Sequence, residues 1–204
     1  MTYDSKHTEI VGPKEGYDTV ANQYGQHHKH LNTFYNIELL RFLPRKASFD
    51  LIDLWAGDGR MFYELNSIPH ETYVALDISK EMLLKHPRGP KQVVADLEKK
   101  LPLEEDSFDV AVSFFTTEHL ENIAGFFSEV YRILRPEGRL FIGHFFQRRE
   151  FERSVNKRNF KIKQWKRSAE ELQKEAEEAF FQVEIFPLYD KDTHTGELII
   201  CKKG

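Results

Sequence analysis

The sequence predicts an α/β protein, a three-layer sandwich in which helices cover both faces of a seven-stranded, mostly parallel sheet. First, apolar runs of strand length alternate with one-faced helical spacing from residue 49 onward. Second, most of these runs are apolar nearly throughout, as in parallel strands that are buried on both faces. Third, the last two runs follow each other without a helix between them, which predicts one antiparallel strand at the C-terminal end.

The composition indicates one compact domain. The chain has 204 residues, of which 40% are hydrophobic and 13% aromatic, enough to bury roughly 70% of the extended-chain surface. A formal charge of −4, from 29 basic and 33 acidic residues, indicates neither a nucleic-acid-binding nor a membrane protein. The single cysteine, Cys201, excludes a disulfide framework within the chain. With a polar N-terminus and no apolar stretch of about 20 residues, these features predict a cytoplasmic protein.

The expected elements follow from the periodicity. We expect residues 1–16 to be a flexible lead-in, and 17–204 to be a single domain with a lid-like insertion at 147–167. Helical spacing predicts a helix from Tyr17 to Leu43, ended by Pro44. Strands are expected at 49–55, 72–76, 93–95, 108–114, 140–146, 183–186 and 198–201. Further helices are expected at about 59–65, from 79 to about 86, at 123–134 and at 168–180.

The loops that follow the first four strands are the expected ligand site, because ligands of such sheets bind at the carboxyl ends of the strands. Gly57 and Gly59 allow a tight turn into a helix, whose free backbone N–H groups would face a bound carboxylate. Asp77, after the second strand, has the right type and place to accept hydrogen bonds from both hydroxyls of a ribose. Asp96, after the third strand, would accept one from the adenine amine. Together these loops predict a site for an adenosine with a charged tail.

A dinucleotide site is the alternative for this glycine turn. Its fingerprint needs a third glycine, which supports close packing of helix on strand. This chain has Phe62 at that position. The large ring conflicts with such packing, so the sequence disfavours nicotinamide or flavin binding.

Several ordered runs resemble one known family. The runs LIDLWAGDGR (51–60) and ALDISKEML (75–83) look like the class I S-adenosylmethionine-dependent methyltransferases, and most like the small-molecule branch that includes quinone-biosynthesis enzymes. Further matches lie at 95–97, 107–110, 118–120 and 131–140, and residues 17–24 resemble that branch's entry segment. The likeness is good over about residues 17–146 and weaker afterwards. It implies a Rossmann-like fold, a methyltransferase activity, S-adenosylmethionine as cofactor and S-adenosylhomocysteine as product.

The resemblance also implies the cofactor contacts. Asp77 would take the ribose hydroxyls, Asp96 the adenine amine, and Leu97 would pack on the adenine ring. The remaining expected cofactor-binding residues would hold the methionine portion, line the floor beneath the sulfonium or close the lid side: Tyr17, Tyr24, Asp53, Trp55, Ala56, Gly57, Gly59, Ile78, Ser113 and Phe114. For the acidic residues the alternative is plain helix capping and turn formation. The chain departs from the family at Trp55, where glycine is usual, and we expect the indole to narrow the methionine end or to reposition the cofactor.

Two histidines are the candidate catalytic bases, because a neutral imidazole can take a proton near pH 7. His119 follows the fourth strand and His144 lies in the fifth. Alternatively, His119 orients the next helix and His144 faces the other side of the sheet. Nothing after the fourth strand resembles the motif of base-amine methyltransferases, and Cys201 is misplaced for cytosine C5 methylation.

A basic segment gives the only indication of the acceptor. Residues 147–167 contain nine lysines and arginines, two glutamates and three interleaved aromatic rings. They predict an anionic acceptor, and the alternative is a solvated loop. The sequence His27-His28-Lys29-His30 indicates an exposed helical face, and we expect no metal. The favoured function is a small-molecule methyltransferase whose acceptor the sequence does not name. The alternatives are a methyltransferase of RNA or protein, and a non-catalytic interaction module.

Overall fold

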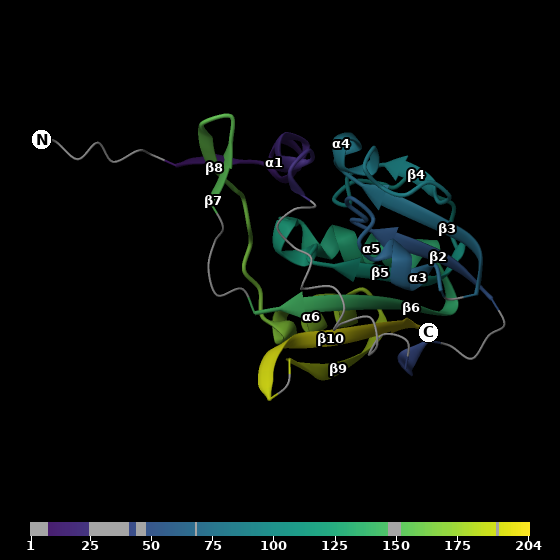
Figure 1. The fold of residues 1–204 in the computed structure, drawn as a ribbon. Coiled ribbons are helices and arrows are strands. Elements are labelled where there is room, and N and C mark those ends of the chain that lie inside the picture. Colours follow the sequence, from purple (N-terminus) through teal and green to yellow (C-terminus); the bar gives the residue numbers. More distant parts are fainter. Residues whose placement is uncertain (1–7, 25–40, 44–47, 68, 147–151, 191) are drawn as a thin grey trace, which may run out of the picture.

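A seven-stranded sheet forms the centre of the protein in a computed structural model that describes residues 8–24, 41–43, 48–67, 69–146, 152–190 and 192–204 (Figure 1). Its strands are β2 (Phe49–Leu54), β3 (His70–Asp77), β4 (Lys91–Val94), β5 (Phe108–Phe114), β6 (Leu134–Phe145), β9 (Phe181–Asp190) and β10 (Thr193–Lys203). They lie in the order β4-β3-β2-β5-β6-β10-β9. Strand β10 pairs antiparallel with β6 and β9, and the other pairs are parallel. The predicted sheet with one antiparallel C-terminal strand is confirmed.

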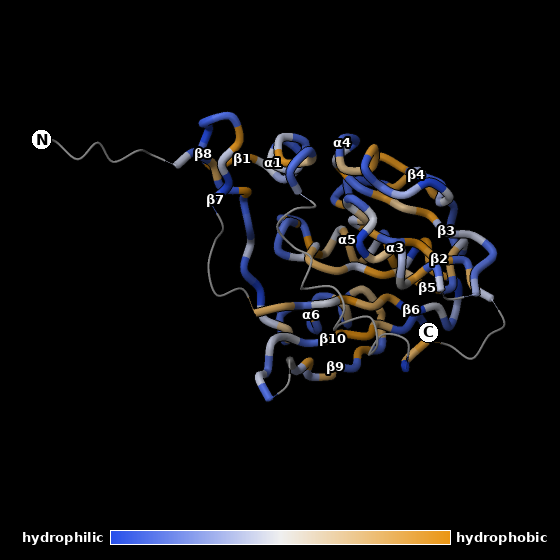
Figure 2. The backbone as a smooth tube through the Cα atoms, in the orientation of Figure 1, coloured by the Kyte–Doolittle hydropathy of each residue, from blue (hydrophilic) through white to orange (hydrophobic). Residues whose placement is uncertain are grey.

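Helices cover both faces of this sheet. Helices α5 (Ile123–Ile133) and α6 (Ala169–Glu178) pack on one face, in a core that includes Leu54 and Cys201. The short helices α3 (Phe62–Leu65) and α4 (Lys80–Leu83) contribute to the core on the other face. Figure 2 shows that hydrophobic residues concentrate along the central strands. The predicted Rossmann-like three-layer fold is therefore confirmed. Within the described ranges, no helix is long and apolar enough to span a bilayer.

A second, three-stranded sheet lies beyond the carboxyl ends of the parallel strands. Strand β1 (Glu9–Val11) pairs in parallel with β8 (Arg158–Ile162), which pairs antiparallel with β7 (Glu152–Val155). Helix α1 (Pro13–Val20) lies between this small sheet and the main one in Figure 1. An added Cβ at Gly16 would lie 2.5 Å from Cγ1 of Ile162 in β8, so glycine permits this close approach. We call β1, α1, β7 and β8 together the lid.

The lid differs from what the sequence predicts for residues 1–16. We expected a flexible lead-in there, but residues 9–16 form β1 and the first half of α1. Pro13 occupies the first turn of the helix, where a missing N–H costs nothing. Helix α1 ends at Val20, short of the predicted Leu43, and residues 25–40 lie outside the described part. That undescribed part includes the histidines of 27–30.

Candidate functional site

The turn after β2 requires its glycines. Gly57 and Gly59 have φ angles of 58° and 83°, in the left-handed region that side chains disfavour. An added Cβ at Gly59 would lie 2.3 Å from Cδ of Pro87, so the turn and the segment after α4 are in close contact. The Gly59 N–H donates to the carbonyl of Ala56 and closes the turn at 3.0 Å. The sequence therefore folds this loop tightly against its neighbours.

Asp77, at the end of β3, joins two of the loops at this edge. Its Oδ2 accepts a hydrogen bond from Gly57 N, and its Oδ1 accepts one from Ser79 N, both at 2.8 Å. The side chain is only 2% exposed, and this burial raises the pKa of its carboxyl group to about 6, although the N–H donors oppose the shift. Carboxylate oxygens can accept more than one hydrogen bond each. Asp77 can thus hold the glycine turn and still accept from a ligand hydroxyl.

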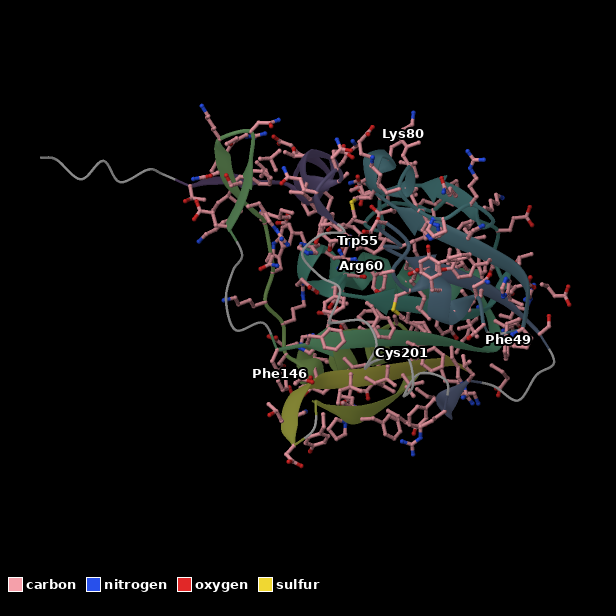
Figure 3. The ribbon with its side chains drawn as sticks, in the orientation of Figure 1. Phe49, Trp55, Arg60, Lys80, Phe146 and Cys201 are labelled. Carbon is pink, nitrogen blue, oxygen red and sulfur yellow. The ribbon has the colours of Figure 1, made fainter. Side chains whose placement is uncertain are left out.

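Trp55 precedes the glycine turn in an unusual backbone conformation. Its φ of 79° costs a non-glycine residue on the order of 1 kcal/mol. The indole stacks on the imidazole of His119, with ring centroids 5.7 Å apart and planes 8° apart. In Figure 3, Phe49 marks the start of β2, and Trp55 lies past its other end, on the side of the lid. The indole thus bridges the end of β2 and the segment that follows β5.

Tyr17 of α1, in the lid, contacts both Trp55 and His119. Its hydroxyl lies 2.8 Å from Nε2 of His119, and its ring meets Trp55 edge-on, with centroids 5.7 Å apart. The other imidazole nitrogen, Nδ1, lies 3.3 Å from the carbonyl oxygen of Lys163, which can only accept. Nδ1 therefore carries the proton, and Tyr17 donates to a lone pair on Nε2. Burial lowers the pKa of His119 to about 4, so the ring is neutral at pH 7.

Other polar contacts join the N-terminal segment to the main domain, and no local sequence pattern indicated their partners. The Ser79 hydroxyl donates to Oδ1 of Asp18 at 2.6 Å, while its oxygen caps α4 by accepting from Met82 N. The guanidinium carbon of Arg60 lies 4.4 Å from the ring centroid of Tyr24, and its NH2 donates to the Tyr24 carbonyl. The lid thereby contacts the loop after β3 through Asp18, and Tyr24, which lies beyond α1, contacts the glycine turn.

Two of the predicted acidic residues make contacts within the protein. Oδ2 of Asp53 accepts a hydrogen bond from the Tyr73 hydroxyl at 3.0 Å, and burial raises the pKa of Asp53 to about 7. Oδ1 of Asp96 accepts one from Glu98 N at 2.9 Å, as in an ordinary turn. For Asp96 this contact is the capping role that we named as the alternative, and its second oxygen leaves room for a ligand amine.

The remaining predicted cofactor residues lie at the same edge of the sheet. Leu97 and Phe114 are buried, and Ile78 is partly exposed beside Asp77. Ser113 is fully buried, and its hydroxyl has no hydrogen-bond partner among the described residues. A buried hydroxyl without a partner costs about 1–3 kcal/mol, so a ligand or water that bonded to it would be stabilising.

His144 lies away from the Tyr17–Trp55–His119 cluster. It pairs across the sheet with Glu197 of β10. It shares a face of β6 with Leu140 and Ile142, which pack in the core with α5 and α6. Its ring meets Phe146 at 6.5 Å, and burial lowers its pKa. Of the two candidate bases, His119 is the one that the fold brings to the glycine turn.

Several cations of the basic segment contact the protein itself. Arg158 forms ion pairs with Glu9 at 2.8 Å and Glu15 at 2.7 Å, which join β8 to β1 and α1. Arg167 donates to the carbonyl oxygens of Thr117, Leu120 and Glu121. Lys163 lies 4.5 Å from the ring centroid of Trp165. Arg148 and Arg149 lie outside the described residues. The segment therefore has a structural role that its composition did not reveal.

Comparison with known proteins assigns the family. A family model described as a methyltransferase domain matches residues 52–142. A ubiquinone/menaquinone biosynthesis C-methyltransferase of Dinoroseobacter shibae is 28% identical over 118 residues, which are 53% of this chain and 47% of that protein. The chain belongs to the class I S-adenosylmethionine-dependent methyltransferases. The resemblance that the sequence motifs carried is confirmed, and S-adenosylmethionine is the cofactor of this family.

Two other proteins are similar to larger parts of the chain. An uncharacterized protein of Methanocaldococcus jannaschii is 33% identical over 142 residues, which are 67% of this chain and 53% of that one. The chain thus spans about half the length of these curated relatives. The crystal structure of a Pyrococcus horikoshii protein matches with a TM-score of 0.73 at 17% identity, over 95% of this chain and 100% of that one. It shares the fold.

Asp77 ends β3 and Trp55 follows β2, at the edge of the sheet where the sequence predicts the cofactor site. Asp77 provides carboxylate acceptors at the end of β3, and its Oδ2 also accepts from Gly57 N. Trp55 stands where the family usually has glycine, and its positive φ explains why glycine suits that position. Tyr17 packs against the indole and is itself only 7% exposed. Tyr17 thus brings helix α1 into contact with the residue that precedes the glycine turn.

Proposed function

We propose that this protein transfers a methyl group from S-adenosylmethionine to a small acceptor that binds beneath the lid. One observation carries the proposal: Asp77 joins the glycine turn to the loop after β3 at the edge where ligands of this fold bind. The matching relatives include enzymes that methylate quinone precursors and a malonyl-[acyl-carrier protein] O-methyltransferase of Hahella chejuensis. These relatives favour a small-molecule acceptor over a macromolecule.

The residues of this chain would divide the work of binding. Asp77 would accept from the ribose hydroxyls, and Asp96 and Leu97 would hold the adenine. Gly57 and Gly59 would let the backbone approach the methionine portion closely, because they carry no side chains at the turn. When bound, S-adenosylmethionine would supply the methyl group: an acceptor lone pair would bond to the methyl carbon while the carbon–sulfur bond breaks and the neutral thioether leaves. The lid would exclude water and hold the acceptor in line, which is most of what this reaction needs.

His119 is the proposed general base for an acceptor that must lose a proton. Its Nε2 lone pair points at the Tyr17 hydroxyl, and the Lys163 carbonyl fixes the tautomer. An acceptor hydroxyl that took the place of the Tyr17 hydroxyl would donate to the same lone pair. Opening of the lid would also hydrate His119 and relieve the burial that lowers its pKa.

The contacts of the basic segment argue against RNA as acceptor. RNA binding needs several cations that can reach phosphates. Arg158 and Arg167 already contact carboxylates or carbonyls of the protein. Exposed Lys157 and Lys166 remain for a single anionic group on a small acceptor.

Transfer of a labelled methyl group tests this function. Purified protein is incubated with methyl-tritiated S-adenosylmethionine and a panel of phenols, quinols, carboxylic acids and amines, with total RNA and a protein extract as separate arms. We expect label in a small-molecule product, and the His119→Gln variant should lose transfer at least tenfold. Label only in RNA or protein, or no transfer in any arm, would contradict the proposal.

A further inference from the structure

Three aromatic rings meet where the end of β2, the segment after β5 and the lid come together. The ring centroids of Tyr17, Trp55 and His119 lie 5.3 to 5.7 Å from one another. Trp55 and His119 are nearly parallel, and Tyr17 is nearly perpendicular to both. Tyr17 and His119 are buried, while Trp55 is only partly so. The cluster therefore leaves part of the indole exposed next to the glycine turn.

The charges around this cluster are compatible with a bound cation. His119 is neutral at pH 7, because burial lowers its pKa to about 4. Burial raises the pKa of Tyr17 well above 10, so the phenol is also uncharged. Two carboxylates, Glu118 and Asp77, raise the Tyr17 pKa further, whereas one guanidinium, Arg153, lowers it. The rings themselves thus add no positive charge that would repel a cation.

We propose that Trp55, supported by Tyr17 and His119, recognises the sulfonium charge of the cofactor by a cation–π contact. This inference rests on the proposed function, in which the glycine turn holds the methionine portion and the floor after β5 lies beneath the sulfonium. Trp55 bridges those two strand ends. Indole is the best π partner for a cation among the side chains, and the contact strengthens when it is shielded from water.

The contact would distinguish the cofactor from its product. S-adenosylmethionine carries the sulfonium charge, and S-adenosylhomocysteine has a neutral thioether in its place. The site therefore binds the charged form more tightly and releases the product after transfer. A glycine at position 55 would leave the backbone relaxed but would offer no such discrimination, which gives the strained Trp55 backbone a function.

Calorimetric titration of the full chain tests the inference without an acceptor. The ligands are S-adenosylmethionine, S-adenosylhomocysteine and sinefungin, which carries an ammonium group near the position of the sulfonium. We expect the wild-type protein to bind both charged ligands about 5- to 30-fold more tightly than S-adenosylhomocysteine. The Trp55→Leu variant should lose this preference, and Trp55→Phe should keep part of it. Tyr63→Leu, which changes a 72% exposed ring on α3, should keep all of it.

The ratio of the affinities for charged and neutral ligands is measured on one variant at a time. A loss of affinity that is common to all ligands therefore leaves this ratio unchanged. Equal wild-type affinities for the charged and neutral ligands would overturn the inference and leave the proposed function standing. Equal losses for all three ligands in Trp55→Leu would overturn it as well, because the indole would then act only by shape. Failure of the wild-type protein to bind any of them would instead overturn the proposed function, and this inference with it.

Discussion

The hydroxyl of Tyr17 donates a 2.8 Å hydrogen bond to Nε2 of His119, across 102 residues of sequence. Tyr17 belongs to the lid and His119 to the segment after β5, so this contact joins the lid to the main domain. Both side chains are buried.

Replacing Tyr17 with phenylalanine should destabilise the protein by roughly 1–3 kcal/mol, because it leaves the buried Nε2 of His119 without a donor. Urea unfolding followed by fluorescence measures this free energy. Tyr63→Phe is the matched control, since Tyr63 is exposed and the change should stay within about 0.5 kcal/mol. Equal midpoints for the two variants would mean that the Tyr17–His119 bond contributes nothing.

His119 should make the stability depend on pH. Its pKa is about 4 in the folded protein, because of burial, against an ordinary value of 6.5. Between these values the unfolded chain binds more protons, so stability rises with pH across the window and is flat above it. The unfolding free energy of wild type minus that of His119→Gln should increase by roughly 1–3 kcal/mol from pH 4 to pH 7. A difference that stays constant would contradict the buried, neutral imidazole.

Asp53 should make the stability of the protein fall as pH rises, which is the opposite of the effect of His119. Burial raises the pKa of Asp53 to about 7 from the ordinary 3.8, so between these values the folded state binds more protons and stability falls as pH rises. Asp53→Asn keeps an acceptor for the Tyr73 hydroxyl and removes the charge. At pH 8 the variant should be the more stable protein by at least roughly 1 kcal/mol, and the gain should vanish near pH 4. Chemical unfolding at both pH values measures it, and a variant that is less stable at pH 8 would contradict this account.

Arg158 should control the order of the lid rather than the stability of the main domain. Its ion pairs with Glu9 and Glu15 are exposed, so they contribute little to global unfolding and weaken in salt. In Arg158→Ala, amide hydrogen exchange should quicken in β1 and α1 and stay the same in β2 and β5. The exposed Lys166→Ala serves as the control. Unchanged exchange in β1 would mean that apolar packing alone holds the lid.

The main sheet was predictable because its signals are local. Runs such as 49–54 and 108–114 are mostly apolar, and the glycine turn follows closely after the first of them. The small sheet within the lid was not predictable, since β1 is only three residues long and pairs with a distant strand, with Glu9 opposite Phe160. Such pairing leaves no periodic pattern in either segment.

The candidate site was predictable in part for the same reason. Its loops are short motifs with characteristic glycines and acids, so Gly57, Gly59 and Asp77 could be named from the sequence. The stacking of Trp55 on His119 depends on how β2 and β5 lie side by side. The internal ion pairs of Arg158 likewise follow from the fold, so composition alone did not reveal them.

Asp77 is the residue on which the cofactor site depends most. Asp77→Ala should weaken S-adenosylhomocysteine binding about ten- to a hundredfold, through the loss of charge-assisted hydrogen bonds to the ribose. The variant should also lose roughly 1–3 kcal/mol of stability, because Gly57 N and Ser79 N lose their buried acceptor. Binding must therefore be measured well below the melting temperature of the variant.

Calorimetric titration of the wild-type protein and Asp77→Ala with S-adenosylmethionine and S-adenosylhomocysteine tests the central claim most directly. We predict micromolar binding of both ligands to the wild type, a rise in its melting temperature as ligand binds the native state, and much weaker binding to the variant. No heat and no thermal shift with either ligand, together with a response to NADH, would contradict the account.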